Sequence, residues 1–196
     1  MTLPFARRRL GRQGFTLVEL VIVLLVATIV AAALLQGPTL GSWRDVRAAA
    51  ELVRAEMLRA IAQAEAVEGE AVFYVDPRID SDGRGAFLAL AGPPGTTRDT
   101  LRGSPPPERS GLRQGAQWGW GNATLGPDGA APTLMPGTVR CRVGQPCRVN
   151  GRDHVVLYLT HARNADAVEA VVLWADLTVQ LLHYQPATGR WIADLR

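Results

Sequence analysis

The sequence predicts an α+β protein in which a long N-terminal helix packs against an antiparallel β-sheet domain. An apolar run that begins at Phe15, followed by an amphipathic stretch that reaches Gly69, predicts the helix. Short apolar runs separated by turn residues fill the C-terminal third and predict the strands. The predicted segments are a basic segment over 1–14, an apolar helix over 15–36, its amphipathic continuation over 37–69 and a β-rich domain over 70–196.

The positive charge is concentrated in the segment before Phe15. The chain has 196 residues and a formal net charge of +3. Four of its 21 basic residues are Arg7, Arg8, Arg9 and Arg12, so loss of this segment leaves 17 basic residues against 18 acidic ones. Without it the chain lacks the overall positive charge that favours non-specific binding to nucleic acid.

The apolar run has the length of a membrane-spanning helix. From Phe15 to Leu35 the only polar residues are Thr16, Glu19 and Thr28. A helix of about 20 apolar residues is long enough to cross the hydrocarbon core of a bilayer. Basic residues on the N-terminal side keep that end in the cytoplasm. We therefore expect a single-pass protein of the inner (cytoplasmic) membrane whose C-terminal domain is periplasmic or otherwise extracytoplasmic.

Glu19 is the one charged residue in this run. An ionised side chain near the centre of a bilayer costs roughly 2.5–3.5 kcal/mol or more, and such a residue indicates a functional site. We therefore expect Glu19 to have a partner of opposite charge. The alternative is a protonated glutamic acid without a partner, close to the membrane interface.

The second half of the predicted helix carries a regular apolar stripe. Gly37-Pro38 predicts an interruption, after which a helical pattern resumes at Trp43 and ends near Gly69. The apolar positions follow alternating steps of four and three residues: Val46, Ala50, Val53, Met57, Ala60, Ala64 and Val67. We expect this stripe to pack on the protein's own sheet, and packing on other subunits is the alternative.

The β-rich domain begins with two predicted strands and ends with four. The predicted strands are 71–75, 86–91, 155–160, 168–174, 177–184 and 190–195, and the last four form an antiparallel meander. Asp176 and the segment 186–189 supply turns within the meander. The Gly- and Pro-rich stretch 92–132 is expected to be a long loop with a short strand near 117–120. In such a strand Trp118 and Trp120 face the same side, either packed over the sheet or exposed to a partner.

Cys141 and Cys147 enclose a short loop that contains Gly144 and Pro146. An extracytoplasmic location permits a disulfide between them. Closing so short a loop adds modest stability, provided that the geometry allows the bond. Two free thiols are the alternative.

The sequence contains no recognisable catalytic or metal-binding motif. The three histidines, His154, His161 and His183, have no zinc-like spacing with the cysteines, and Asp80, Asp82, Asp128 and Asp166 do not form a calcium-binding loop. No nucleophile elbow or phosphate-binding glycine loop is present. We therefore expect no enzymatic activity, no metal and no cofactor.

The stretch Gly14-Phe15-Thr16-Leu17-Val18-Glu19-Leu20 resembles the leader junction of type IV pilins and type II secretion pseudopilins. The resemblance covers about the first 35 residues. It implies that a prepilin peptidase cuts after Gly14 and N-methylates the new amino terminus at Phe15, and that Glu19 is the carboxylate used in subunit assembly. Phe15 and Glu19 are four residues apart and lie on one face of a helix. Many pilins have a proline at the position of Gln36, whereas here the proline is Pro38.

The transition from the helix to the first strand, from Arg54 through Gly69 to Val75, resembles that of H-type minor pseudopilins and FimT-like minor pilins. The implied function is that of a structural minor pseudopilin of a type II secretion system, incorporated into the pseudopilus or its tip. The alternative is a minor pilin of a type IV pilus. The implied partners are other pilins or pseudopilins, the prepilin peptidase, the inner-membrane assembly platform and membrane lipid.

DNA capture during uptake is a further alternative for a FimT-like protein. Four arginines near the cysteine pair could contact phosphates: Arg140, Arg142, Arg148 and Arg152. The same four residues also fit ordinary exposed strand edges. The near-neutral charge of the chain after Gly14 favours the assembly function over DNA capture.

Overall fold

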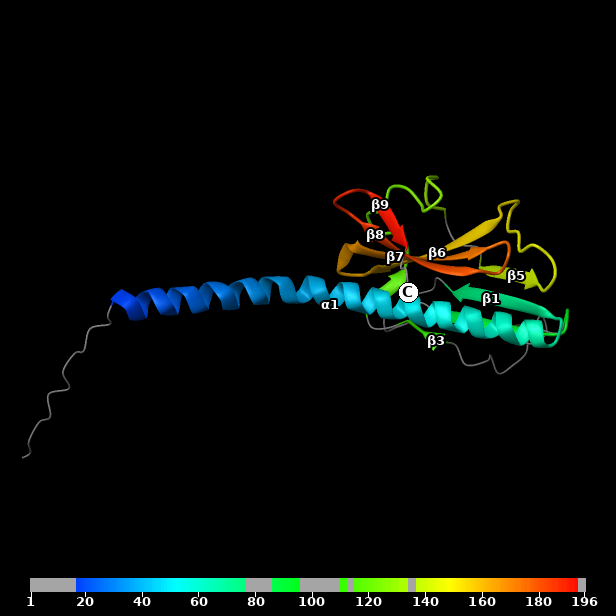
Figure 1. Ribbon diagram of the computed structural model, residues 1–196, viewed down its shortest axis with the longest axis horizontal. Coiled ribbons are helices and arrows are strands. Elements are labelled where there is room, and N and C mark those ends of the chain that lie inside the picture. The colour runs from blue at the N-terminus through cyan, green and yellow to red at the C-terminus, as the bar shows by residue number, and fades with distance from the viewer. Residues whose placement is uncertain (1–16, 77–85, 96–109, 113–114, 134–136, 194–196) are drawn as a thin grey trace, which may run out of the picture. The chain divides into compact units, whose positions relative to one another are not determined.

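The computed structural model describes residues 17–76, 86–95, 110–112, 115–133 and 137–193, with the backbone alone for 32–40, 86, 110 and 111. The chain divides into two compact units, residues 1–38 and 39–196. Helix α1 (Leu17–Ala66) contributes to both units, and the strands belong to the second (Figure 1). The strands are β1 (Glu70–Asp76), β2 (Ala86–Gly92), β3 (Ser110–Gly111), β4 (Ala116–Trp118), β5 (Thr138–Arg142), β6 (His154–His161), β7 (Asn164–Trp174), β8 (Val179–Gln185) and β9 (Arg190–Ala193). The α+β prediction is thus confirmed.

Helix α1 includes Gly37 and Pro38, so the interruption predicted there does not end the helix. A proline removes one backbone hydrogen bond and crowds the preceding turn. The helix nevertheless continues through both residues and ends at Ala66.

Helix α1 ends in a Schellman motif. The Gly69 N–H donates to Ala64 O at 2.9 Å, and the Glu68 N–H donates to Glu65 O at 3.2 Å. The left-handed residue of the motif is Glu68, with φ 48°, and not Gly69. Gly69 is required for a different reason, because a Cβ there would lie 2.1 Å from the backbone oxygen of Gly92. The predicted C-terminal glycine is therefore a point of close approach between two backbones.

One sheet has the strand order β3-β2-β1-β5, with antiparallel neighbours throughout. Strand β5 lies in a region for which the sequence predicted no strand. Its side chains alternate between exposed and buried, with Val139 and Cys141 facing inward. The first two predicted strands, 71–75 and 86–91, are confirmed as β1 and β2.

The other sheet has the order β4-β6-β7-β8-β9. The predicted four-strand meander is confirmed as β6 to β9, and β4 adds a fifth strand beside β6. Asp176 closes the turn before β8, since its Oδ1 accepts hydrogen bonds from the backbone and the hydroxyl of Thr178. The strand predicted from Leu177 begins at Val179, because Leu177 is left-handed, with φ 67°.

The main core lies between the second half of α1 and both sheets (Figure 1). The predicted stripe on α1 is buried there, together with Ala49 and Ile61: Val46, Ala50, Val53, Met57, Ala60 and Ala64. Packing on the protein's own sheets is therefore confirmed. Val67 was wrongly included, since it follows the last helical residue and is 53% exposed.

The segment 119–133 and Trp191 cover the opposite face of the second sheet. Trp120 packs there with Tyr158, at 6.5 Å between ring centroids. Trp118 instead packs beside Phe87 at the edge of the main core. The prediction that both tryptophans face one side is wrong, because β4 ends at Trp118 and the alternation of a strand does not continue to Trp120.

Candidate functional site

The first half of α1 exposes apolar side chains on every side of the helix. Between Leu17 and Val30, eleven large apolar residues are each 51–80% exposed. Because they occupy almost every position, they form no single stripe that one neighbouring element could cover. A helix that is apolar all round is normally surrounded by protein or lipid, so this segment is a surface that other molecules are expected to cover.

Residues 17–31 of α1 contain two polar residues, Glu19 and Thr28. Glu19 lies in the first turn of α1 and is exposed. Thr28 donates its hydroxyl to Leu25 O at 2.8 Å, so the helix itself satisfies this donor. Glu19 is therefore the one ionisable side chain between residues 17 and 31 of the described helix. Gly14 and Phe15, the predicted cleavage and methylation positions, lie outside the described residues.

The predicted disulfide is present between Cys141 and Cys147, and both residues are buried. The loop that it closes contacts two other elements through the backbone. The Val143 N–H donates to Gly69 O at 3.0 Å, and the Cys147 N–H donates to Ala175 O at 2.9 Å. The disulfide loop thus connects the end of α1, strand β5 and the turn between β7 and β8.

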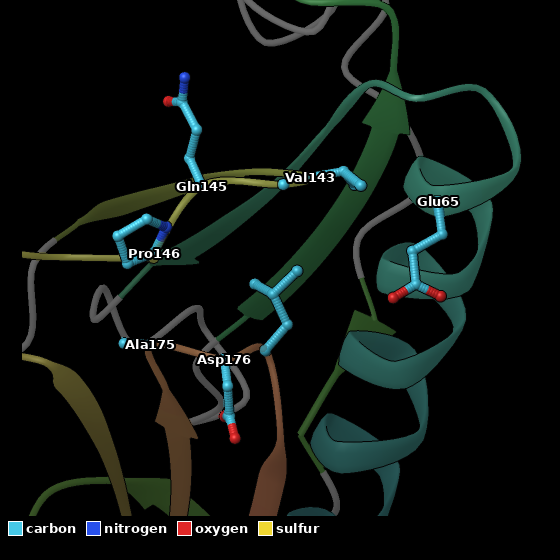
Figure 2. A pocket seen from close by; sticks show the side chains of 8 residues that line it. Glu65, Val143, Gln145, Pro146, Ala175 and Asp176 are labelled. Atoms are coloured by element: carbon cyan, nitrogen blue, oxygen red, sulfur yellow. The ribbon is translucent and has the colours of Figure 1, made fainter.

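An open cavity of about 500 Å³ lies beside this loop. Figure 2 shows Glu65 on α1 on one side, Val143 and Pro146 of the loop on another, and Asp176 of the β7–β8 turn below them. The hydrogen bonds from Thr178 lower the pKa of Asp176, so its carboxyl group is ionised. The lining has no basic residue among those described.

The arginines near the disulfide loop are engaged with carboxylates. Arg140 lies 3.4 Å from Glu70, Arg148 lies 2.7 Å from Asp153, and Arg152 lies 3.6 Å from Asp128. Arg142 is exposed on β5. Three of the four predicted phosphate contacts therefore have acidic neighbours, which would compete with a nucleic acid for the guanidinium groups.

The histidines do not form a common site. His154 lies 3.2 Å from Asp128, His161 lies 3.9 Å from Asp45, and His183 contacts a different carboxylate. No group of three or more His, Cys, Asp or Glu side chains that could hold a metal ion occurs within the described residues. Asp80 and Asp82 lie outside that part of the chain.

A buried carboxylate that the sequence did not predict joins α1 to the second sheet. Glu169 on β7 is 2% exposed, and its Oε1 lies 2.9 Å from Nδ1 of His183. Its Oε2 lies 3.5 Å from Nη1 of Arg47 on α1, and Arg47 also donates to Glu51. This carboxylate could have been noticed in the sequence, because Glu169 is the one charged residue in the apolar run 168–174, as Glu19 is in the apolar run that begins at Phe15.

Comparison with known proteins identifies one motif. Residues 9–35 match the family described as the prokaryotic N-terminal methylation motif. No curated protein and no solved structure matches the chain. The motif supports a type IV pilin-like protein that is processed by prepilin peptidase, and it suggests that peptidase and other pilins as partners.

Motifs of this kind are typical of membrane-anchored proteins. No helix within the described residues is long and apolar enough to cross a membrane.

Proposed function

We propose that this protein is a structural, non-enzymatic subunit of a type II secretion pseudopilus, with the role of an H-type minor pseudopilin. The observation that carries the proposal is a methylation motif whose helical part, residues 17–31, is apolar on all sides and contains one carboxylate, Glu19. In this role the apolar helix lies in the membrane before assembly and among neighbouring helices afterwards. In this role the subunit is incorporated into the pseudopilus or its tip.

Cleavage after Gly14 creates a new ammonium group at Phe15, which the same peptidase methylates. Neither this ammonium nor the Glu19 carboxylate is stable alone in apolar surroundings, because each loses its hydration. Pairing between Glu19 of an incoming subunit and Phe15 of its neighbour offsets both losses. The pairing also fixes the axial register of the two subunits, since each subunit has one freed amino terminus and one carboxylate in its apolar run.

Substitution of Glu19 tests this assembly step. Glu19→Ala is expected to leave leader removal largely intact and to abolish incorporation, measured as recovery of the processed protein with sheared filaments. Thr28→Ala is the matched control, because it removes a polar group that the helix already satisfies, and we expect it to assemble normally. Normal incorporation of Glu19→Ala would contradict the proposed pairing.

A minor pilin of a type IV pilus is the alternative within the same class. The two machines differ in the phenotype of a strain that lacks the gene. Loss of protein secretion with normal pili supports the pseudopilus. Loss of pili or of DNA uptake with normal secretion supports the pilus and rejects our choice of machine.

A further inference from the structure

A second cavity, of about 330 Å³, lies on the face of the β4–β9 sheet that is turned away from α1. Strand β6 supplies His154, Val156 and Tyr158 to its lining, and the preceding hairpin supplies Asn150 and Arg152. Asp128, from the segment that covers this face, supplies a carboxylate. The cavity thus gathers polar side chains from three parts of the domain over an apolar base.

The charges in this cavity balance. Asp128 Oδ2 lies 3.2 Å from Nε2 of His154 and 3.6 Å from Nη1 of Arg152, while Oδ1 accepts the Ala130 N–H at 3.1 Å. Burial opposes ionisation of Asp128, but these hydrogen bonds and His154 outweigh it, so the pKa of Asp128 lies below its ordinary value. The carboxylate therefore persists at neutral pH beside a guanidinium that is half exposed.

The hydroxyl of Tyr158 takes no part in these hydrogen bonds and ion pairs. The residue is 4% exposed, and its hydroxyl has no hydrogen-bond partner among the described residues. Burial and the nearby Asp128 carboxylate raise the pKa of Tyr158 to about 12, so the hydroxyl remains a donor. Gly126 leaves room for it, because a Cβ there would lie 2.4 Å from the hydroxyl oxygen. The hydroxyl oxygen borders the cavity and is not sealed from solvent, so it can donate a hydrogen bond to a molecule that enters the cavity.

The donors and acceptors restrict the chemistry of the ligand. Asp128 repels an anion and Arg152 repels a cation, whereas a hydroxylated ligand can donate to the carboxylate and accept from Arg152 and Tyr158. The volume lies at the small end of the range for ligand sites, about 300–1,000 Å³. Trp174, which is 38% exposed and lies 5.4 Å from the His154 ring, offers an apolar surface beside the cavity. We propose that this cavity binds one neutral sugar ring of a polysaccharide.

The test is binding of sugars to the full chain in a detergent without a sugar headgroup, followed by saturation-transfer NMR and calorimetry. N-acetylglucosamine represents cell-wall glycan, and glucose with cellobiose represents secreted or extracellular polysaccharide. Glucuronate, glucosamine and diglycine are the charged and peptide-like comparators. We expect a neutral sugar to bind more tightly than every comparator, and the neutral sugar that binds more tightly indicates the source of the polysaccharide.

Two variants distinguish a loss of binding at the cavity from a loss that results from destabilised folding. Tyr158→Phe should weaken binding of the neutral sugar between about twofold and tenfold, as expected for one hydrogen bond. Tyr184→Phe is the matched control, because Tyr184 is equally buried on the same face but packs against Trp191 outside the cavity lining. We expect Tyr184→Phe to bind as the unaltered protein does.

Three results would overturn the proposal. They are tighter binding of a charged or peptide-like comparator, no binding of any neutral sugar at millimolar concentration, and equal effects of the two tyrosine substitutions. Asp128→Asn gives an independent check, since removal of the negative charge should improve binding of glucuronate relative to glucose. No such gain would also count against the proposed charge balance.

Discussion

Substitution of Gly69 is expected to destabilise the domain by steric conflict. A Cβ at this position would lie 2.1 Å from the oxygen and 2.8 Å from the carbon of the Gly92 carbonyl, against ordinary contact at 3.4 Å or more. Both atoms are backbone, and Gly92 is paired with Glu70 in the β1–β2 ladder. Relief therefore requires movement of a strand and not of a side chain. Overpacking costs about 1–3 kcal/mol, and we expect Gly69→Ala to lie near the upper value.

Substitution of the neighbouring residue, Glu68, by glycine should stabilise the domain. Glu68 is left-handed, with φ 48°, which costs an L-residue about 1–2 kcal/mol. Glycine removes that cost but loses about 0.4–1 kcal/mol through the greater freedom of the unfolded chain. Removal of a negative charge at the helix C-terminus adds a few tenths of a kcal/mol in favour of the variant. We expect Glu68→Gly to stabilise the domain by about 0.5–1 kcal/mol.

Thermal and urea unfolding of residues 39–196, which form one compact unit, measure both effects. At about 2–4 °C per kcal/mol, Gly69→Ala should lower Tm by roughly 6–12 °C and Glu68→Gly should raise it by roughly 1–4 °C. Gly137→Ala is the control, because a Cβ at Gly137 would meet open space. A Tm for Gly69→Ala that matches that of Gly137→Ala would refute the argument from close approach.

Three further predictions concern the core, the disulfide and pH. Met57→Ala should lower the free energy of unfolding by about 2–5 kcal/mol, because Met57 is 1% exposed. Leu58→Ala, at a position that is 42% exposed, should lower it clearly less, and urea unfolding of both variants measures the difference. Replacement of Cys141 and Cys147 by serine should lower Tm, and a reducing agent should lower the Tm of the unaltered protein but not that of the variant. Asp128 has a lowered pKa when folded, so its contribution to stability is present above its ordinary pKa of 3.8 and is lost as the pH falls below it. The Tm difference between the unaltered protein and Asp128→Asn should therefore be largest near neutral pH and disappear in acid; a constant difference would contradict this assignment.

Periodic patterns in the sequence were sufficient to predict the elements that pack locally. The stripe from Val46 to Ala64 repeats over several turns, so its buried face was predictable. The strands of the C-terminal meander are joined by short turns, and their pairing follows from chain order. The prediction for Val67 was wrong because periodicity alone does not show where a helix ends.

The division into two sheets was not predictable from local patterns. Strand β5 pairs with β1 across more than 60 residues, and a five-residue alternation within a Gly- and Pro-rich region is a weak signal. Pairing at such a distance depends on the whole fold and not on the segment itself. The same applies to the segment 119–133, whose place over the second sheet depends on Trp120 and Trp191 meeting there.

Of the candidate sites, the N-terminal methylation motif could be recognised from the sequence because its residues are consecutive. The Asp128–Tyr158 cavity could not, since its members come from separate segments and each residue alone is unremarkable. The site around Glu169 was predictable only in part. Its apolar surroundings in β7 are visible in the sequence, but its partners Arg47 and His183 are brought to it by the fold.

The most direct test of the proposed pilin-like role is the mass of the mature N-terminal peptide isolated from the native membrane fraction. Our account predicts a chain that begins at Phe15 and carries one methyl group on its amino nitrogen. A chain that retains the residues before Phe15, or one cut elsewhere, would contradict both the processing and the pairing of Glu19 with a freed amino terminus.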